Sequence, residues 1–137
     1  MSIQLVFVTD SLFKQNDELA FYLRKDFAVT VILTDDAKQF SADKKIQMVM
    51  DADLVVVNYP SNKKSDERAA LTLVRASTKK PMILLGLFDR DIDSVTMLQV
   101  IKLGCRLEYF YPTSDLLYAS INIARIYEEK FKNKVSS

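Results

Sequence analysis

The feature that most constrains this chain is a repeated pattern of short apolar runs separated by segments long enough to form helices. Most of the runs are rich in β-branched residues, which favour strands. Their apolar character is nearly continuous, as in strands that are buried on both faces of a sheet. The five runs are Gln4–Thr9, Ala28–Thr34, Asp53–Tyr59, Met82–Phe88 and Arg106–Tyr111.

The segments between and after these runs show apolar residues at helical spacing. This spacing predicts helices over Ser11–Phe27, Asp35–Met50, about Glu67–Ser77, about Asp91–Leu103, and from Thr113 or Ser114 to about Lys132. Asp10 or Ser11 is expected to cap the first helix, and Gly104 to end the fourth. Pro112 is expected to stop the fifth strand.

Five strands that alternate with five helices form βαβ units, whose strands run parallel. Right-handed crossovers then place helices on both faces of the sheet. The sequence of 137 residues therefore predicts one α/β domain with a doubly wound, five-stranded parallel sheet. The domain is expected to span residues 1–132, followed by a frayed tail at residues 133–137.

Composition excludes several classes of function. The net charge of +1 gives no electrostatic reason to expect nucleic acid as a partner. No apolar run approaches the length of about 18 residues that a membrane span requires. The single cysteine, Cys105, fits a reducing cytoplasm, and "MSIQLVFVTD" does not resemble a signal peptide. We therefore expect a cytoplasmic location.

The absence of histidine removes the most common general base and zinc ligand. With only Gly86 and Gly104, the chain cannot form a glycine-rich phosphate-binding loop. We therefore expect neither an enzyme nor a bound metal or cofactor.

In a doubly wound sheet the chemistry lies at the carboxyl ends of the strands. These ends carry Thr9 and Asp10, Asn58, Gly86, and Tyr111 with Pro112. Further acids follow the strands at Asp35, Asp36, Asp89 and Asp91. Such residues either add negative charge near this edge or act as helix caps and first-turn acids.

Three segments, "DLVVVNYP", "PMILLGLF" and "GCRLEYFYP", together resemble the receiver domain of bacterial response regulators. The resemblance covers nearly the whole chain. It implies a flavodoxin-like sheet with the strand order 2-1-3-4-5. It also implies a role in a bacterial signalling pathway, exercised through protein partners.

The chain departs from that family at most positions of the phosphorylation pocket. Asn58 stands at the position of the phospho-accepting aspartate, Thr9 and Asp10 at the acid pair, Gly86 at the switch hydroxyl and Tyr111 at the lysine. Only Asp10 and Pro112 match. Because a neutral amide is a poor nucleophile and Mg²⁺ prefers anionic oxygens, we predict a pseudo-receiver that is not phosphorylated.

Two interpretations of Asn58 remain open. Its amide could hydrogen-bond Asp10 or nearby backbone and so hold the pocket in one state without a ligand. Alternatively, Asn58 is only a turn residue at the end of a strand. Asp10 could likewise be a helix cap rather than a metal ligand.

The last strand and helix form the candidate interface. The resemblance points to the same surface, because receiver domains commonly form contacts through it. The apolar arc of the final helix spans about 220° at 100° per residue, more than one buried stripe needs. The exposed flank of this helix could contain Ile123 and Ile126, or it could contain Ile121. A neighbouring helix or the tail could also cover the excess apolar surface. We predict a homodimer or another protein partner that contacts Tyr109, Phe110, Tyr118, Ile123 and Ile126.

An alternative is a small-ligand-binding domain, because the predicted fold also resembles flavodoxin. The loop "TDSLFKQN" would then lie at the ligand, with Asp10, Asn58 and Tyr111 as contacts. This loop contains no glycine, and Asp10 would repel a phosphate group.

Overall fold

The computed structural model describes residues 2–11, 13–58, 72–73, 75–76, 81–87, 106–113 and 115–132. Its strands are β1 (Gln4–Thr9), β2 (Ala28–Leu33), β3 (Leu54–Asn58), β4 (Pro81–Leu87) and β5 (Arg106–Thr113). Its helices are α1 (Asn16–Leu23), α2 (Ala42–Asp51) and α5 (Leu116–Ile126), which continues into a π-helical turn, η1 (Tyr127–Phe131).

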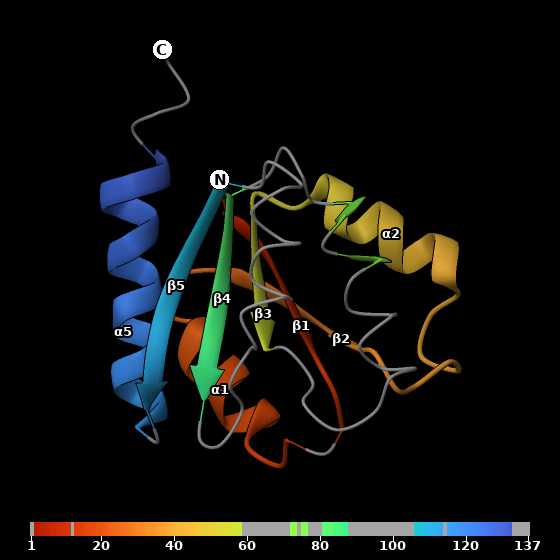
Figure 1. Ribbon diagram of the computed structural model, residues 1–137, viewed down its shortest axis with the longest axis horizontal. Coiled ribbons are helices and arrows are strands. Elements are labelled where there is room, and N and C mark those ends of the chain that lie inside the picture. Colours follow the sequence, from red (N-terminus) through yellow and green to blue (C-terminus); the bar gives the residue numbers. More distant parts are fainter. Residues whose placement is uncertain are drawn as a thin grey trace.

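All strands belong to one sheet with the order β2-β1-β3-β4-β5 (Figure 1). Each neighbouring pair is parallel. The parallel order of β2, β1, β3 and β4 is therefore confirmed, and β5 pairs with β4 at the edge, as the resemblance implies. Because β1 lies between β2 and β3, the direction of winding reverses there, and doubly wound sheets place their binding sites at the carboxyl ends of the strands at such a point.

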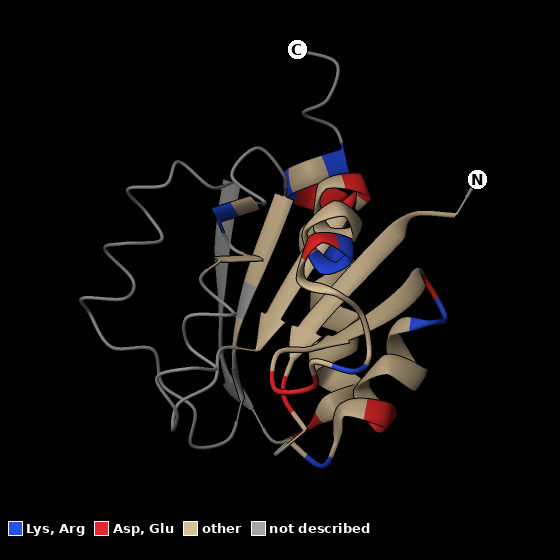
Figure 2. Cartoon of the chain, turned by 90° about the vertical axis from the view of Figure 1, so that its right-hand side faces the viewer, with Lys and Arg blue, Asp and Glu red and all other residues tan. Residues whose placement is uncertain are grey.

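Helices cover both faces of the sheet, and the strand side chains alternate between them. On one face Leu5 and Phe7 of β1 pack with α1, α5 and η1. On the other face Val6 and Val8 pack with Val49 of α2. The strands β1 to β4 contain no charged residue (Figure 2), which fits a sheet that is covered on both sides.

The first two helices begin later than the sequence predicted. α1 begins at Asn16 rather than at Ser11, and its N-cap residue, Gln15, makes no side-chain capping bond. α2 begins at Ala42 rather than at Asp35, with the Ser41 side chain accepting a hydrogen bond from Lys44 N. The segments before both helices form turns in which aspartate side chains satisfy backbone N–H groups, as described below.

The last strand and helix also differ from the prediction. β5 runs to Thr113, so Pro112 lies within the strand and does not stop it. Asp115 caps α5 by accepting a hydrogen bond from Tyr118 N, whereas we expected Thr113 or Ser114 to do so. Proline is tolerated there because β5 is an edge strand with one unpaired side.

Some predictions fall outside the described residues. These include the helix over Asp91–Leu103, most of the helix over Glu67–Ser77, and the tail at 133–137. Residues 72–73 and 75–76 are helical, in agreement with the second of these predictions. Within the described residues, no helix combines the length and the apolar character needed to cross a membrane.

Candidate functional site

The carboxyl ends of β1 and β3 bring together side chains that are far apart in the sequence. In the parallel pairing Val8 of β1 lies opposite Val57 of β3. Thr9 and Asn58 therefore occupy corresponding positions at the end of their strands. Neither side chain is accessible to solvent, since both residues are 0% exposed.

Four residues form a chain of hydrogen bonds at this edge. Asn58 Nδ2 donates to Thr9 Oγ1 over 3.2 Å, and Thr9 Oγ1 donates to Asn16 Oδ1 over 2.9 Å. Asn16 Nδ2 in turn donates to the backbone carbonyl of Asp10 over 2.6 Å. We call Asn58, Thr9, Asn16 and Asp10 the polar chain. All four are buried, and the chain links β3 to β1 and to the start of α1.

The direction of every bond in the polar chain follows from its last member. A backbone carbonyl can only accept, so Asn16 must present its NH₂ group to Asp10 and its Oδ1 to Thr9. The Thr9 hydroxyl must then donate its single hydrogen to Asn16, and only its lone pairs remain for Asn58. Asn58 must therefore present its NH₂ group to Thr9.

This orientation leaves Asn58 Oδ1 buried without a hydrogen-bond partner in the described part of the chain. A buried acceptor that lacks a partner costs about 1–3 kcal/mol. Asn58 is thus a neutral donor at the end of the central strand, with one acceptor that a ligand carrying a hydrogen-bond donor could satisfy.

Asp10 serves the loop between β1 and α1. Its Oδ1 accepts a hydrogen bond from Phe13 N over 3.1 Å, which closes a turn immediately after the strand. The prediction that Asp10 caps the first helix is therefore wrong, because the helix begins six residues later, at Asn16. Asp10 or nearby backbone was one possible partner for Asn58, but the Asn58 amide donates to the Thr9 side chain instead.

Acids after β2 hold the neighbouring loop in place. Asp35 accepts hydrogen bonds from Ser11 N at 3.0 Å and 3.2 Å and also contacts the Ser11 hydroxyl. Asp36 Oδ1 accepts from the backbone N–H groups of Lys38 and Gln39. Both carboxylates thus stabilise turns and do not cap a helix. Asp89 and Asp91 lie outside the described residues.

For the remaining predicted pocket residues, the structure describes the backbone but not the side chains. Gly86 lies in β4 and Tyr111 and Pro112 lie in β5, at the same edge of the sheet as Asn58. The pairing between these strands shifts register between Leu85 and Leu87, next to Gly86. The side chain of Tyr111 lies outside the described part. Within the described part, no group of three His, Cys, Asp or Glu residues could hold a metal ion.

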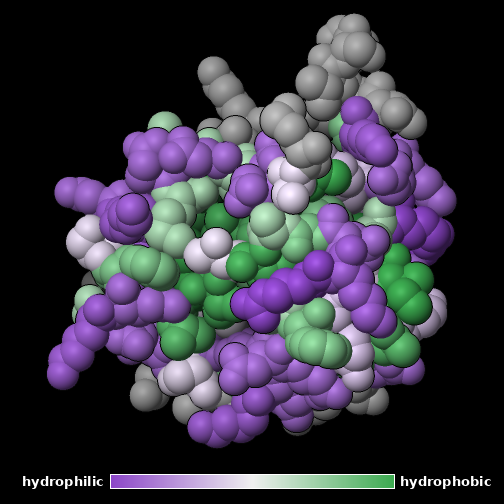
Figure 3. Space-filling model, turned by 180° about the vertical axis from the view of Figure 1, so that it is seen from behind, coloured by the Kyte–Doolittle hydropathy of each residue, from purple (hydrophilic) through white to green (hydrophobic). Residues whose placement is uncertain are grey.

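The predicted interface residues on the last helix separate into two sets. Ile123 is 0% exposed and Ile126 packs against the core, so this flank faces inward and not toward a partner. The exposed apolar residues of α5 are Leu117, Tyr118 and Ile121, with 42%, 55% and 56% of their surface accessible. Figure 3 shows hydrophobic atoms at the surface on the side where α5 lies. The side chains of Tyr109 and Phe110 lie outside the described residues.

Asn16 is the member of the polar chain that the sequence did not predict. Its position gave a signal, since it precedes Leu19, Ala20 and Leu23 by three, four and seven residues. That spacing places an amide on the buried face of the helix. A buried amide needs partners, and the nearest polar strand end is Thr9.

Comparisons with known proteins identify the fold but not the family. No family model matches the sequence, and no curated protein is significantly similar to it. A response regulator from Colwellia psychrerythraea superposes with a TM-score of 0.62 at 10% identity, over 93% of this chain and 98% of the other. The chain therefore shares the flavodoxin-like fold that receiver domains also have.

Other solved structures share this fold. A flavodoxin-like domain from Synechococcus sp. has a TM-score of 0.60 at 16% identity, over 87% of this chain and 92% of that one. A CMP N-glycosidase from Clostridium botulinum has a TM-score of 0.60 at 12% identity, over 88% and 99% respectively. Because one fold hosts such different functions, the function must be argued from the site.

Proposed function

We propose that this chain is a receiver-type signalling domain that is not phosphorylated and that acts by binding protein partners. The observation that carries the proposal is Asn58, a buried amide at the end of β3 whose NH₂ group donates to Thr9. A nucleophile at this position would need a negatively charged oxygen. An amide that is buried and already hydrogen-bonded cannot supply one.

The polar chain further supports the proposal. In it the Thr9 hydroxyl donates to the Asn16 side chain, and the Asn16 amide donates to the backbone carbonyl of Asp10. A receiver pocket that needs no phosphate also needs neither a second acid nor a lysine. The neutral residues at Thr9, Gly86 and Tyr111 agree with that requirement.

Intact-mass spectrometry tests the proposal directly. The protein is incubated with Mg²⁺ and acetyl phosphate, with a phosphorylatable receiver domain in the same tube as a positive control. We expect the control to gain one phosphoryl group and this chain to keep its mass. A single phosphoryl adduct that maps to the carboxyl edge of the sheet would refute the proposal.

We propose further that the exposed flank of α5, formed by Leu117, Tyr118 and Ile121, is the partner surface, with a second copy as one partner. Exposed apolar patches often mark protein interfaces.

In analytical ultracentrifugation we expect the wild type to dimerise and Ile121→Glu to be monomeric. Met50→Glu is the matched control, because Met50 is 49% exposed on α2, across the sheet. A wild type that is monomeric at every concentration would contradict self-association.

The alternative function, binding of a small ligand at the carboxyl edge, is favoured by one observation. Asn58 Oδ1 is buried and has no partner within the described residues. A ligand with an N–H or O–H group at this edge could donate a hydrogen bond to Asn58 Oδ1. A thermal-shift screen of the wild type and Asn58→Ala tests this alternative, and stabilisation of the wild type alone would support it.

A further inference from the structure

A pocket of about 280 Å³ lies on the α2 side of the sheet, separate from the polar chain. It is near the lower limit of small-molecule sites, which are typically about 300–1,000 Å³. Its wall comes from the loop after β2, the first turns of α2 and residues 72–73. The residues that matter here are Thr34, Phe40, Ala42, Lys45, Ile46 and Leu73.

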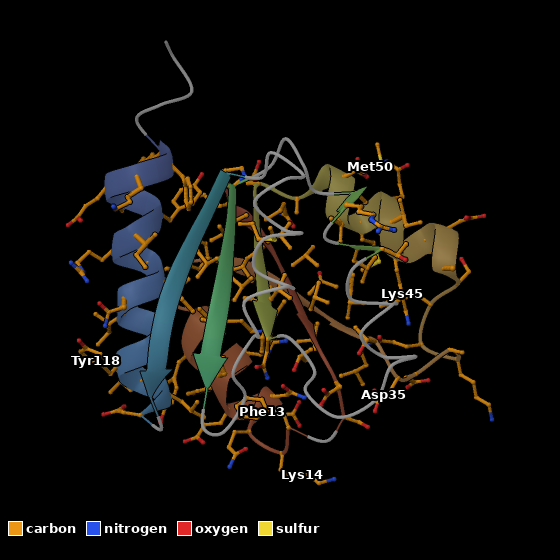
Figure 4. All side chains as sticks on the ribbon, viewed as in Figure 1. Phe13, Lys14, Asp35, Lys45, Met50 and Tyr118 are labelled. Atoms are coloured by element: carbon orange, nitrogen blue, oxygen red, sulfur yellow. The ribbon has the colours of Figure 1, made fainter. Side chains whose placement is uncertain are left out.

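Lys45 is the charged residue among the described residues that line this pocket, and it is only 8% exposed. Its Nζ donates to the carbonyls of Leu33 and Asp36, over 2.9 Å in each case. Figure 4 shows the Lys45 side chain reaching from α2 toward the loop that carries Asp35. An ammonium group has three hydrogens, so these two bonds leave one for another acceptor.

The two partners of Lys45 are neutral, and within the described residues no carboxylate forms an ion pair with it. A buried charge is costly unless an opposite charge balances it. Backbone carbonyls meet the hydrogen-bonding need of the ammonium but leave its net charge in place. Among the described residues, the pocket therefore offers an ammonium group that has no ion-pair partner.

The rest of the pocket is largely apolar. Phe40 and Ile46 are half-buried and Leu73 is 4% exposed. Thr34 adds a hydroxyl that is buried without a partner in the described part of the chain. The described lining thus combines one cation, the two threonines Thr34 and Thr72, and apolar walls.

We propose that this pocket binds a small monocarboxylate with a compact apolar body. The carboxylate accepts the remaining hydrogen of the Lys45 ammonium and supplies the missing negative charge, while one of its oxygens reaches the Thr34 hydroxyl. The hydrocarbon part lies against Phe40, Ile46 and Leu73. Phosphate fits less well, because its greater negative charge calls for more positive charge than the single Lys45 ammonium supplies.

Isothermal titration calorimetry with the full chain tests this proposal, using benzoate and its neutral analogue benzamide at constant ionic strength. We expect benzoate to bind with a Kd of about 1 mM or lower. We expect benzamide to bind at least about tenfold more weakly, because a hydrogen bond to a charged group is stronger than a neutral one. Inorganic phosphate serves as a third probe and is expected to bind more weakly than benzoate.

Substitutions test whether the preference for benzoate over benzamide arises in this pocket. Lys45→Met should reduce benzoate affinity at least about tenfold and bring it close to that of benzamide. Lys44→Met is the matched control, since Lys44 is an exposed neighbour on α2 and should leave affinity unchanged. Ala42→Leu should block both ligands while Lys45 stays in place, which keeps the test valid if Lys45→Met does not fold.

Three results would overturn the proposal. The first is a wild type that does not bind benzoate, or binds it no more tightly than benzamide. The second is Ala42→Leu binding benzoate as the wild type does. The third is phosphate binding more tightly than benzoate, which would indicate a site for a multiply charged anion. None of these results depends on whether Asn58 can be phosphorylated.

Discussion

An amide and a carboxylate have almost the same shape, but at the end of β3 the amide has a specific structural role. Asn58 donates to Thr9, and Thr9 donates to Asn16, so that each hydrogen bond depends on the direction of the next. A carboxylate at residue 58 would supply no donor to this chain. The polar chain thus uses the one property in which asparagine differs from aspartate.

Asn58→Asp should therefore destabilise the protein, by about 1–3 kcal/mol at neutral pH. Burial raises the pKa of the introduced carboxyl above its value in the unfolded chain. The folded state then binds more protons than the unfolded state above about pH 4, so the loss of stability should grow as pH rises.

Urea denaturation of this variant at about pH 5 and pH 8 measures the effect. Gln47→Glu, an exposed amide-to-acid change on α2, is the control. It removes the hydrogen bond from Gln47 to Asp51 and places two acids four residues apart, which should cost less than about 1 kcal/mol. An Asn58→Asp protein as stable as the wild type at both pH values would show that the polar chain is unimportant for folding.

Tyr127 gives a second prediction at the residue scale. Its ring packs edge-on against Phe27, with ring centroids 5.8 Å apart. Burial first, and then the negative charges of Asp53 and Glu128, raise the pKa of the Tyr127 hydroxyl above its usual value of 10.0, against a smaller opposing effect of Lys132.

Above about pH 10 the unfolded chain loses this proton while the folded protein retains it, so stability falls as pH rises through that range. Tyr127→Phe should remove this contribution, and its stability should fall less steeply than that of the wild type between about pH 9.5 and 11. Parallel denaturation curves for the two proteins would contradict the assignment.

At the scale of elements, the strands could be predicted closely and the helix starts could not. Buried parallel strands give continuous apolar runs, which fix their position in the sequence. The start of a helix depends on which local hydrogen bonds compete with it. Asp10 and Asp36 bind backbone N–H groups in turns before α1 and α2, and each helix begins only after those turns.

The N-cap of α2 tests this account of helix starts. Ser41→Ala removes the acceptor for Lys44 N and should cost about 1 kcal/mol, whereas Ser41→Asp, which keeps an acceptor, should cost much less. Chemical denaturation of both variants provides the comparison. Equal losses for the two substitutions would mean that the side-chain cap contributes little.

At the scale of the whole molecule, the parallel sheet and the strand ends that meet at its carboxyl edge followed from the sequence, and the strand order followed from the resemblance to receiver domains. Thr9, Asp10 and Asn58 meet at the carboxyl edge because parallel strands end there together. The hydrogen bonds among them did not follow, because they depend on Asn16 and on a turn that periodicity cannot reveal. The buried Lys45 was missed for a similar reason, since its partners are backbone carbonyls.

The central claim is that the carboxyl edge of the sheet stays in one state without phosphate or metal. Nuclear magnetic resonance of the ¹⁵N-labelled protein, titrated with Mg²⁺ and beryllofluoride, tests it most directly, because beryllofluoride imitates a phosphoryl group on aspartate. We predict unchanged amide signals for Thr9, Asp10, Ser11 and Asn58. Saturable shifts confined to these residues would contradict the claim.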